Sequence, residues 1–359
     1  MEKENIIKAF ETLGLFLKQF STVSFNANPE IKKLNDKFSD NFKDILRKTE
    51  INNPWFTEES IRISFYALST MLSKGNIQNW LSKYSKIHKS GKAKNIGLVS
   101  AGNIPLVAFH DILSVLVTGH NLQIKLSSKD DILFPEIIKI LIYLFEGFER
   151  KITIQDEKLE NIEAVIATGS DNSSRYFQYY FGKYPNIIRS NRNSIAIITG
   201  NESSDQIKKL ADDVFLYFGL GCRNVSKIYL PRSFDQTRIL DNFEHYNHYS
   251  NHTKYANNYD YQRAILLVNK IPFLDNGFLI FREEKSLNSP VACLHYELYD
   301  NQEELNTLID QEKSNIQCIV TESDLFNDKI NFGKTQFPNL NDYADNMDSI
   351  EFLLNLYEK

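Results

Sequence analysis

The sequence has few cysteines, and their spacing gives them no evident structural role. Its 359 residues include three, Cys222, Cys293 and Cys318, none of them in a C-x-x-C pair. Neither a disulfide framework nor a structural zinc site is therefore expected. Cys293 and Cys318 lie in apolar, strand-like runs, where a cysteine usually serves as a small buried hydrophobe. Cys222 differs because it lies in the glycine-containing stretch FGLGCRNVS.

Other patterns are also missing, and each absence excludes a class of function. The sequence contains neither G-x-G-x-x-G nor G-x-x-x-x-G-K-[ST], which excludes the standard dinucleotide fingerprint and the P-loop. No basic block interleaved with aromatic residues occurs, and the net charge is -5, so no nucleic-acid partner is expected. His110 and His120 lack metal-ligand spacing with carboxylates, so no metal site is expected.

Long apolar segments are absent as well. The run IIKILIYLF is too short to span a membrane and contains a lysine. The first residues, MEKEN, lead directly into a helical pattern without the regions of a signal peptide. We therefore expect a soluble, cytoplasmic protein without a membrane span.

What the chain does contain is an alternation of strand and helix patterns after a mostly helical lead-in over residues 1–90. Such alternation indicates an α/β protein with mostly parallel sheets covered on both faces. We expect two α/β units that meet near residues 200–204, followed by a short C-terminal tail. The expected strands cover residues 94–100, 122–127, 162–169, 194–200, 225–231, 277–281, 291–298 and 316–320. The expected helices cover residues 104–119, 133–148, 174–183, 205–219, 235–246, 255–269 and 302–310.

Three polar loops follow the first three expected strands: SAGNIP, LSSKDD and TGSDNSS. Ligands of α/β sheets bind beyond the carboxyl ends of the strands, so these loops are the candidate ligand site. Considered alone, their serines and threonines are more simply interpreted as helix caps. The alternative is a nucleotide site built from hydroxyls, a lysine and helix N-termini.

For single residues in these regions, the sequence likewise leaves open whether the role is structural or functional. Asn103 either caps the helix that follows it or donates its amide to a developing oxyanion. His110 and His120 are candidate bases, although a lone histidine on a helix is more often structural. Cys222 follows a helix C-terminus, whose dipole disfavours a thiolate, while the neighbouring Arg223 favours one.

Taken in order, SAGNIPL, GHNLQIKLSS, ATGSDNSSRY and FGLGCRNVSKIYLP resemble the aldehyde dehydrogenase superfamily. More closely they resemble its acyl-CoA reductases, the LuxC-like fatty acid reductase family. The resemblance runs from about Lys94 to the C-terminal tail. It implies an aldehyde dehydrogenase-like α/β fold with a Rossmann-type cofactor domain, an α/β catalytic domain and a helical N-terminal lead-in. The domains implied are residues 1–202 for the lead-in and NADP binding, 203–325 for the catalytic thiol, and a tail, 326–359, returning to the cofactor domain.

The resemblance also implies roles for single residues. Cys222 corresponds to the nucleophile, and Asn103 to the side-chain oxyanion donor. Lys125 and Ser127 correspond to the segment that contacts the adenosine ribose. Thr168, Gly169 and Ser170 correspond to the loop near the cofactor phosphates. NADPH is the implied cofactor and a homo-oligomer the implied assembly.

One departure from the superfamily pattern narrows the expected chemistry. Hydrolytic members carry a glutamate base in an E-L-G-G-K segment, whereas the corresponding stretch here, IIRSNRNSIAII, has no glutamate. A thioester on Cys222 would then exchange with an external thiol and would not be hydrolysed. We therefore expect an NADPH-dependent reductase of acyl-CoA or acyl-protein thioesters that releases an aldehyde. The alternatives are a CoA-acylating dehydrogenase working in the oxidative direction, or a catalytically silent nucleotide- or acyl-carrier-binding subunit.

Overall fold

The computed structural model describes residues 2–88 and 91–358, which form two compact units. The first unit comprises residues 1–190 and 338–359, and the second comprises Asn191–Phe337. The resemblance described above implies a boundary after residue 202. In the structure, strand β6 (Asn193–Ile197) pairs with strands of the second unit. Each unit is described by itself below.

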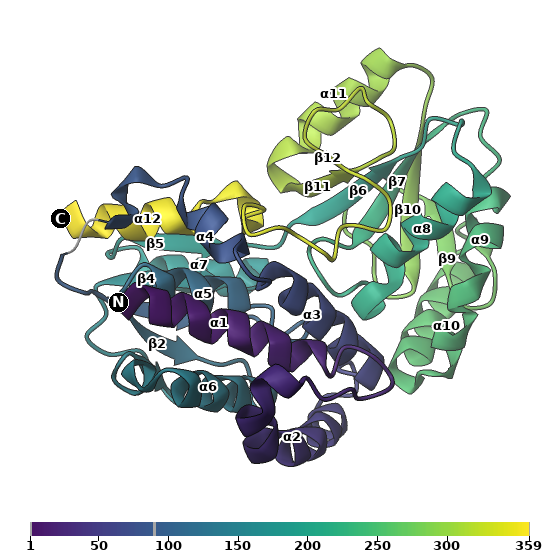
Figure 1. The fold of residues 1–359 in the computed structure, drawn as a ribbon. Coiled ribbons are helices and arrows are strands. Elements are labelled where there is room, and N and C mark those ends of the chain that lie inside the picture. Colours follow the sequence, from purple (N-terminus) through teal and green to yellow (C-terminus); the bar gives the residue numbers. More distant parts are fainter. Residues whose placement is uncertain (1, 89–90, 359) are drawn as a thin grey trace. The chain divides into compact units, whose positions relative to one another are not determined.

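The first unit is built on a five-stranded parallel sheet with the order β3-β2-β1-β4-β5 (Figure 1). All five strands are parallel, but the chain adds β2 and β3 on one side of β1 and β4 and β5 on the other, so a topological switch point lies between β1 and β4. The strands are β1 (Asn95–Val99), β2 (Asn121–Lys125), β3 (Ile152–Ile154), β4 (Ala164–Thr168) and β5 (Asn186–Arg189).

Alternating side chains of this sheet enter two separate cores. In β4, Ala164 and Ile166 belong to the large core, while Val165 and Ala167 belong to a smaller cluster with Phe177. This alternation follows from the two-residue period of a strand and requires helices on both faces. The helices that connect the strands are α5 (Phe109–Val117), α6 (Leu133–Leu144) and α7 (Asp171–Phe181).

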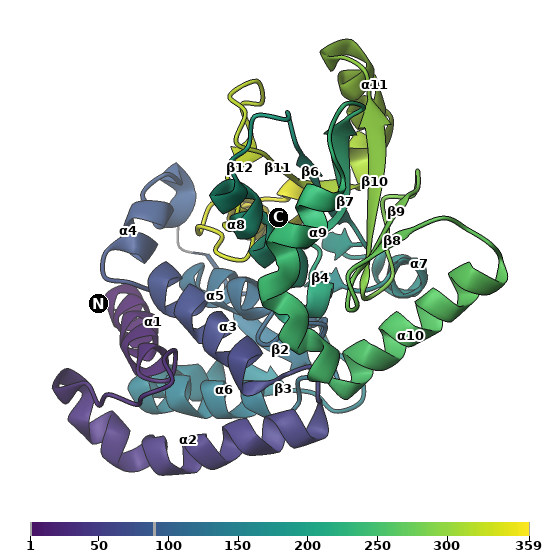
Figure 2. The ribbon, with the colours of Figure 1, turned by 90° about the vertical axis from the view of Figure 1, so that its right-hand side faces the viewer.

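The helical lead-in packs on the large core. Helix α1 lies beside α3 and α6, and α2 lies along α6 (Figures 1 and 2). Phe10, Phe16 and Phe42 are fully buried there, which explains the high phenylalanine content of this segment. The C-terminal helix α12 packs on α5. The elements named are α1 (Glu2–Lys18), α2 (Lys32–Asn52), α3 (Glu58–Met71), the short α4 (Asn76–Leu81) and α12 (Ser349–Asn355).

The second unit contains a seven-stranded sheet with the order β12-β11-β6-β7-β10-β9-β8. All neighbouring pairs are parallel except β8 and β9. Besides β6, the strands are β7 (Val225–Pro231), β8 (Leu274–Asp275), β9 (Ile280–Glu283), β10 (Cys293–Tyr299), β11 (Ile316–Val320) and β12 (Lys329–Ile330). The helices are α8 (Ser204–Phe215), α9 (Thr237–Phe243), α10 (Thr253–Val268) and α11 (Gln302–Glu312). Helix α8 lies beside α9 (Figure 2).

The α/β class, the parallel sheets and the helical lead-in are confirmed, and two local expectations are corrected. Helix α5 begins at Phe109 and not near Ile104, because residues 105–108 form a turn in which Leu106 has a φ of 58°. The segment SSKDD does not cap α6, whose N-cap is Ile132, and instead forms a turn closed by the Asp130 N–H on the Ser127 carbonyl at 2.9 Å. Across residues 2–88 and 91–358, no helix is long and apolar enough to cross a membrane.

Candidate active site

The three polar loops of the first unit begin side by side at one edge of its sheet. Val99 pairs with Lys125 on one side and with Ala167 on the other, so SAGNIP, LSSKDD and TGSDNSS leave the sheet together. SAGNIP and TGSDNSS follow the two strands that flank the switch point. This edge is where an open α/β sheet binds its ligands.

The loop that carries Asn103 is held from two directions. The Leu106 N–H donates to Asp130 Oδ2 at 2.8 Å, and Ser64 Oγ of α3 donates to the Pro105 carbonyl at 3.0 Å. A Cβ on Gly102 would lie 2.5 Å from Ser127 Oγ, so only glycine allows this approach of the two loops. Asn103 itself is half-buried and is not the N-cap of α5. The capping interpretation of Asn103 is therefore wrong for this helix.

Asp130 is a component of this edge that sequence analysis missed. Its side chain is 1% exposed, and Oδ1 has no hydrogen-bond partner among the described residues. Burial raises the pKa of Asp130 to about 7, against the opposing effect of the Leu106 N–H. No sequence signal distinguishes Asp130 from the exposed Asp131 beside it, because only the tertiary fold decides which carboxylate is buried.

A pH-dependent stability follows from this burial. The folded pKa near 7 exceeds the unfolded value of about 3.9, so the contribution of Asp130 is complete below pH 4 and is lost as the pH rises through 7. Relative to Asp130→Asn, the wild type should lose free energy of unfolding between pH 5 and pH 7, by up to about 1.4 kcal/mol per pH unit, and stay level above pH 8. Urea unfolding at these pH values measures the difference. Asp131→Asn is the matched control and should keep the pH-dependent loss of the wild type. If Asp131→Asn removed that loss as fully as Asp130→Asn does, the assignment would be contradicted.

The residues expected to contact a cofactor lie at this same edge. Lys125 ends β2 and donates its Nζ to the Glu157 carbonyl, while the Ser127 N–H donates to Ser100 Oγ at 3.1 Å. Thr168 ends β4, and Ser170 caps α7 by accepting the Ser173 N–H at 3.4 Å. Hydroxyls, an ammonium group and a capped helix N-terminus are the donors that suit the phosphates and ribose of a dinucleotide. The donor set therefore fits such a cofactor.

Cys222 lies before a strand and not after one, in the turn that precedes β7 of the second unit. The turn is closed by the Asn224 N–H on the Gly221 carbonyl at 3.0 Å, and Ser194 Oγ at the start of β6 donates to the Cys222 carbonyl at 3.0 Å. Because β6, β7 and β10 are adjacent and parallel, the segments that precede them lie at one amino-terminal edge of the sheet.

The backbone leading to Cys222 is unusual. Tyr217, Phe218 and Gly219 all have a positive φ, between 57° and 72°, which non-glycine residues rarely adopt. The buried Asn224 side chain stabilises this geometry by donating to the carbonyls of Asp213 at 3.0 Å and Leu216 at 2.9 Å. These are carbonyls at the end of α8, so their negative field is partly compensated. The C-terminal end of α8 therefore disfavours a Cys222 thiolate less than a helix end with unpaired carbonyls would.

The three cysteines differ sharply in their surroundings. Cys222 is partly exposed, whereas Cys293 and Cys318 are buried in strands β10 and β11. Burial raises the pKa of the Cys293 thiol to about 12, which keeps it protonated near neutral pH. Arg223 Nη1 lies 3.6 Å from Cys318 Sγ. Cys222 is thus the one cysteine of the three that is partly exposed.

No carboxylate base replaces the missing glutamate within residues 187–198. The next glutamate along the chain, Glu202, is buried, and its carboxylate accepts the N–H groups of Thr199 at 2.7 Å and Gly200 at 2.9 Å. These contacts give Glu202 a structural role in the turn before α8. A proton-accepting role at a reacting water is therefore not expected for Glu202.

The two candidate histidine bases are structural. His120 is buried, its Nδ1 accepts the Lys94 N–H at 3.1 Å, and its Nε2 lies 3.0 Å from the Leu353 carbonyl. His110 Nε2 lies 3.0 Å from the Leu340 carbonyl. Both rings connect the C-terminal segment, residues 338–359, to the rest of the first unit. Within the described part of the chain, no cluster of His, Cys, Asp and Glu is suited to hold a metal ion.

Comparison with solved structures shows the aldehyde dehydrogenase fold. An indole-3-acetaldehyde dehydrogenase in complex with NAD+ matches with a TM-score of 0.59 and 12% identity over 90% of this chain and 76% of its own. Aldehyde dehydrogenase 21 from Physcomitrella patens, in complex with succinate, matches with a TM-score of 0.62 and 10% identity over 98% and 87%. The NAD+ complex of an aldehyde dehydrogenase from Mycobacterium tuberculosis matches with a TM-score of 0.58 and 13% identity over 88% and 73%. No protein-family model and no curated protein sequence matches the chain.

Proposed function

We propose that the protein is an NADPH-dependent acyl thioester reductase that releases an aldehyde through a thioacyl group on Cys222. The observation that carries the proposal is the position of Cys222, the one partly exposed cysteine of three, in a stabilised turn of an aldehyde dehydrogenase fold. The lack of a glutamate in residues 187–198 supports thioester exchange over hydrolysis. Solved neighbours in complex with NAD+ support a nicotinamide dinucleotide, and the resemblance to acyl-CoA reductases favours NADPH.

The chain's own residues account for the acyl transfer. The Cys222 thiolate attacks the acyl carbonyl carbon, so a carbon–sulfur bond forms while the carbonyl electron pair moves to oxygen. The Asn103 amide and the Cys222 N–H are the donors assigned to that oxyanion. When the carbonyl re-forms, the bond to the CoA sulfur breaks and the CoA thiolate leaves and takes up a proton. Cys222 then carries the acyl group as a thioester.

A nicotinamide dinucleotide, when bound, would supply the hydride that reduces the thioester carbon. The remaining steps belong to the protein. The tetrahedral alkoxide left on Cys222 re-forms its carbonyl, the carbon–sulfur bond breaks, and the aldehyde and the Cys222 thiolate are released. Lys125, Ser127, Thr168, Gly169 and Ser170 are the residues assigned to hold the dinucleotide.

A panel of acyl-CoA thioesters tests the proposal directly. With NADPH and purified protein, we expect cofactor oxidation and aldehyde release in equal amounts for at least one chain length. The same aldehyde with NADP+ and water should yield almost no free acid, while added CoA should restore NADPH formation. Efficient acid formation without CoA would contradict the proposal and indicate a hydrolytic dehydrogenase. Faster turnover with aldehyde and CoA than with acyl-CoA would favour the oxidative direction.

A further inference from the structure

The connection between β9 and β10 in the second unit crosses the sheet without a helix. Both strands are parallel, so the chain must return from the carboxyl edge, after Glu283, to the amino edge, before Cys293. Parallel strands are usually joined by a helix, which satisfies its own backbone groups. Here residues 284–292 are irregular, and we call them the crossover segment. Their backbone needs hydrogen-bond partners from elsewhere.

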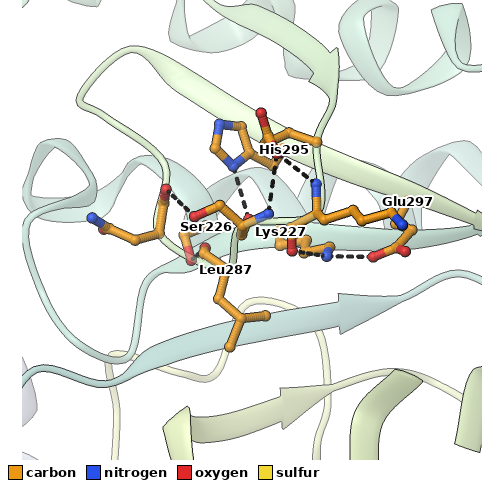
Figure 3. Close-up of polar contacts among 9 residues, drawn as sticks. Ser226, Lys227, Leu287, His295 and Glu297 are labelled. Carbon is orange, nitrogen blue, oxygen red and sulfur yellow. Dashed lines mark hydrogen bonds and ion pairs between the residues drawn. The ribbon is translucent and has the colours of Figure 1, made fainter. Parts of the chain in front are cut away.

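Side chains of the sheet provide these partners for three consecutive carbonyls (Figure 3). Lys227 Nζ donates to the Lys285 carbonyl at 2.6 Å, and His295 Nδ1 lies 2.9 Å from the Ser286 carbonyl. Ser226 Oγ donates to the Leu287 carbonyl at 2.6 Å. The N–H groups of Lys285 and Ser286 are accepted by Glu284 Oε1. The first half of the crossover segment is thus fixed by side chains.

The charges behind these contacts are deeply buried. Lys227 is 1% exposed and pairs with Glu297 Oε2 at 2.5 Å, while His295 is 2% exposed and lies opposite Lys227 on the neighbouring strand. A carbonyl can only accept, so His295 Nδ1 carries the proton and Nε2 is left without a partner among the described residues. Burial lowers the pKa of His295, which agrees with a neutral ring. Burying a lysine and an incompletely paired histidine costs folding free energy. We therefore attribute a role to both side chains in holding the crossover segment.

The second half of the crossover segment lies across a cavity from residues on either side of the Cys222 turn. A cavity of about 30 Å³ is bounded on one side by Ser289–Cys293 and on the other by Phe218, Gly219, Val225 and Ser226. Ser226 therefore contacts both the crossover segment and the cavity. Strand β7 follows the Cys222 turn and β10 follows the crossover segment, and these two strands are adjacent. The residues that line this cavity and the Cys222 turn therefore lie at the same edge of the sheet.

We infer that Ser226, Lys227 and His295 are positioning residues that hold the crossover segment against the Cys222 turn and thereby set the reactivity of the Cys222 thiol. For turnover the inference rests on the function proposed above. The three side chains act through the backbone carbonyls of residues 285–287, and none of them contacts the reacting atoms in this scheme. Without them, the carbonyls of residues 285–287 would lose their hydrogen bonds to the sheet, and the crossover segment, held then by its backbone bonds at Glu284 and Ala292, would move relative to the turn.

Alkylation of Cys222 by iodoacetamide tests the inference without any acyl substrate. Ser226→Ala should change the alkylation rate by about three- to tenfold, the factor that corresponds to one ordinary hydrogen bond. Hydrogen exchange of residues 285–292 should rise in the same variant. Ser250→Ala, which removes an exposed hydroxyl bond to the Asn247 carbonyl at 2.7 Å, is the matched control and should change neither quantity.

Variants of His295 separate positioning from general stability. His295→Leu removes the donor to Ser286, whereas His295→Asn keeps an N–H near the position of Nδ1. We expect the leucine variant to change the alkylation rate and the asparagine variant to restore it towards the wild-type value. Unchanged alkylation in both Ser226→Ala and His295→Leu overturns the inference. If no acyl-CoA is reduced by the wild type, the proposed function fails while these two readouts still decide the positioning role.

Discussion

Replacing Cys222 by alanine is expected to abolish aldehyde formation, with a loss on the order of 10⁴-fold or more, because the other two cysteines are buried and neither replaces the nucleophile. The variant should also fail to acquire an acyl label. Wild-type protein incubated with a labelled acyl-CoA in the absence of NADPH should carry one acyl group on the peptide containing Cys222. Intact-mass and peptide analysis measure both results.

Cys318→Ala is the matched control for this experiment. Cys318 is buried in β11 and contacts Arg223, so its removal tests whether loss of any thiol affects the reaction. The control should keep the acyl label on Cys222 and most of the activity. A fully active Cys222→Ala variant, or a label found on another residue, would refute the assigned mechanism.

Asn103→Ala is expected to slow the reaction less than Cys222→Ala does. Loss of one oxyanion donor typically lowers kcat by about a hundredfold or more, so this variant should be severely slowed. Its Cys222 should still react with iodoacetamide at the wild-type rate, because Asn103 is assigned to the oxyanion and not to the thiol. A normal kcat would remove Asn103 from the oxyanion site.

The largest expected effect on stability comes from Asp111→Ala in the first unit. Asp111 on α5 forms a two-pronged ion pair with Arg189 at the end of β5, at 2.6 and 3.0 Å, and both residues are buried. Removing the carboxylate leaves a buried guanidinium without its counterion, which typically costs about 3–5 kcal/mol. Urea unfolding measures the loss.

The double variant Asp111→Leu, Arg189→Met provides the test of mechanism. It removes both charges, so it should recover much of the lost stability. Asp300→Ala, which breaks the exposed pair between Arg232 and Asp300, should change stability far less. If Asp111→Ala unfolds no more readily than Asp300→Ala, the buried pair contributes little to the first unit.

Local sequence patterns predicted the long strands of both units and, among the short strands, only β9, through the apolar run GFLIF at residues 277–281. Strands β1, β2, β4, β6, β7, β10 and β11 carry apolar runs or alternation over several residues and were all expected. Strands β3, β5, β8 and β12 have two to four residues, which is too few for a period to be recognised. They form because a neighbouring strand offers them hydrogen bonds.

The start of α5 shows why a local pattern places a boundary wrongly. Pro105 in a helical pattern is typical of a first turn, so the helix was expected to begin near Ile104. In the structure, the Leu106 N–H is bound by Asp130 and the Pro105 carbonyl by Ser64. Both partners are distant in sequence, and they hold residues 105–108 in a turn that positions Asn103 at the sheet edge.

The sequence by itself determined the α/β class, the order of loops at the sheet edge and the singular position of Cys222, because each follows from local patterns and from their order along the chain. The tertiary structure decided which polar groups are buried. Asp130, the pair of Asp111 with Arg189, and the contacts of Ser226, Lys227 and His295 to the crossover segment became visible only there. Their roles depend on burial and on partners far apart along the chain, and periodicity within a segment carries no information about either.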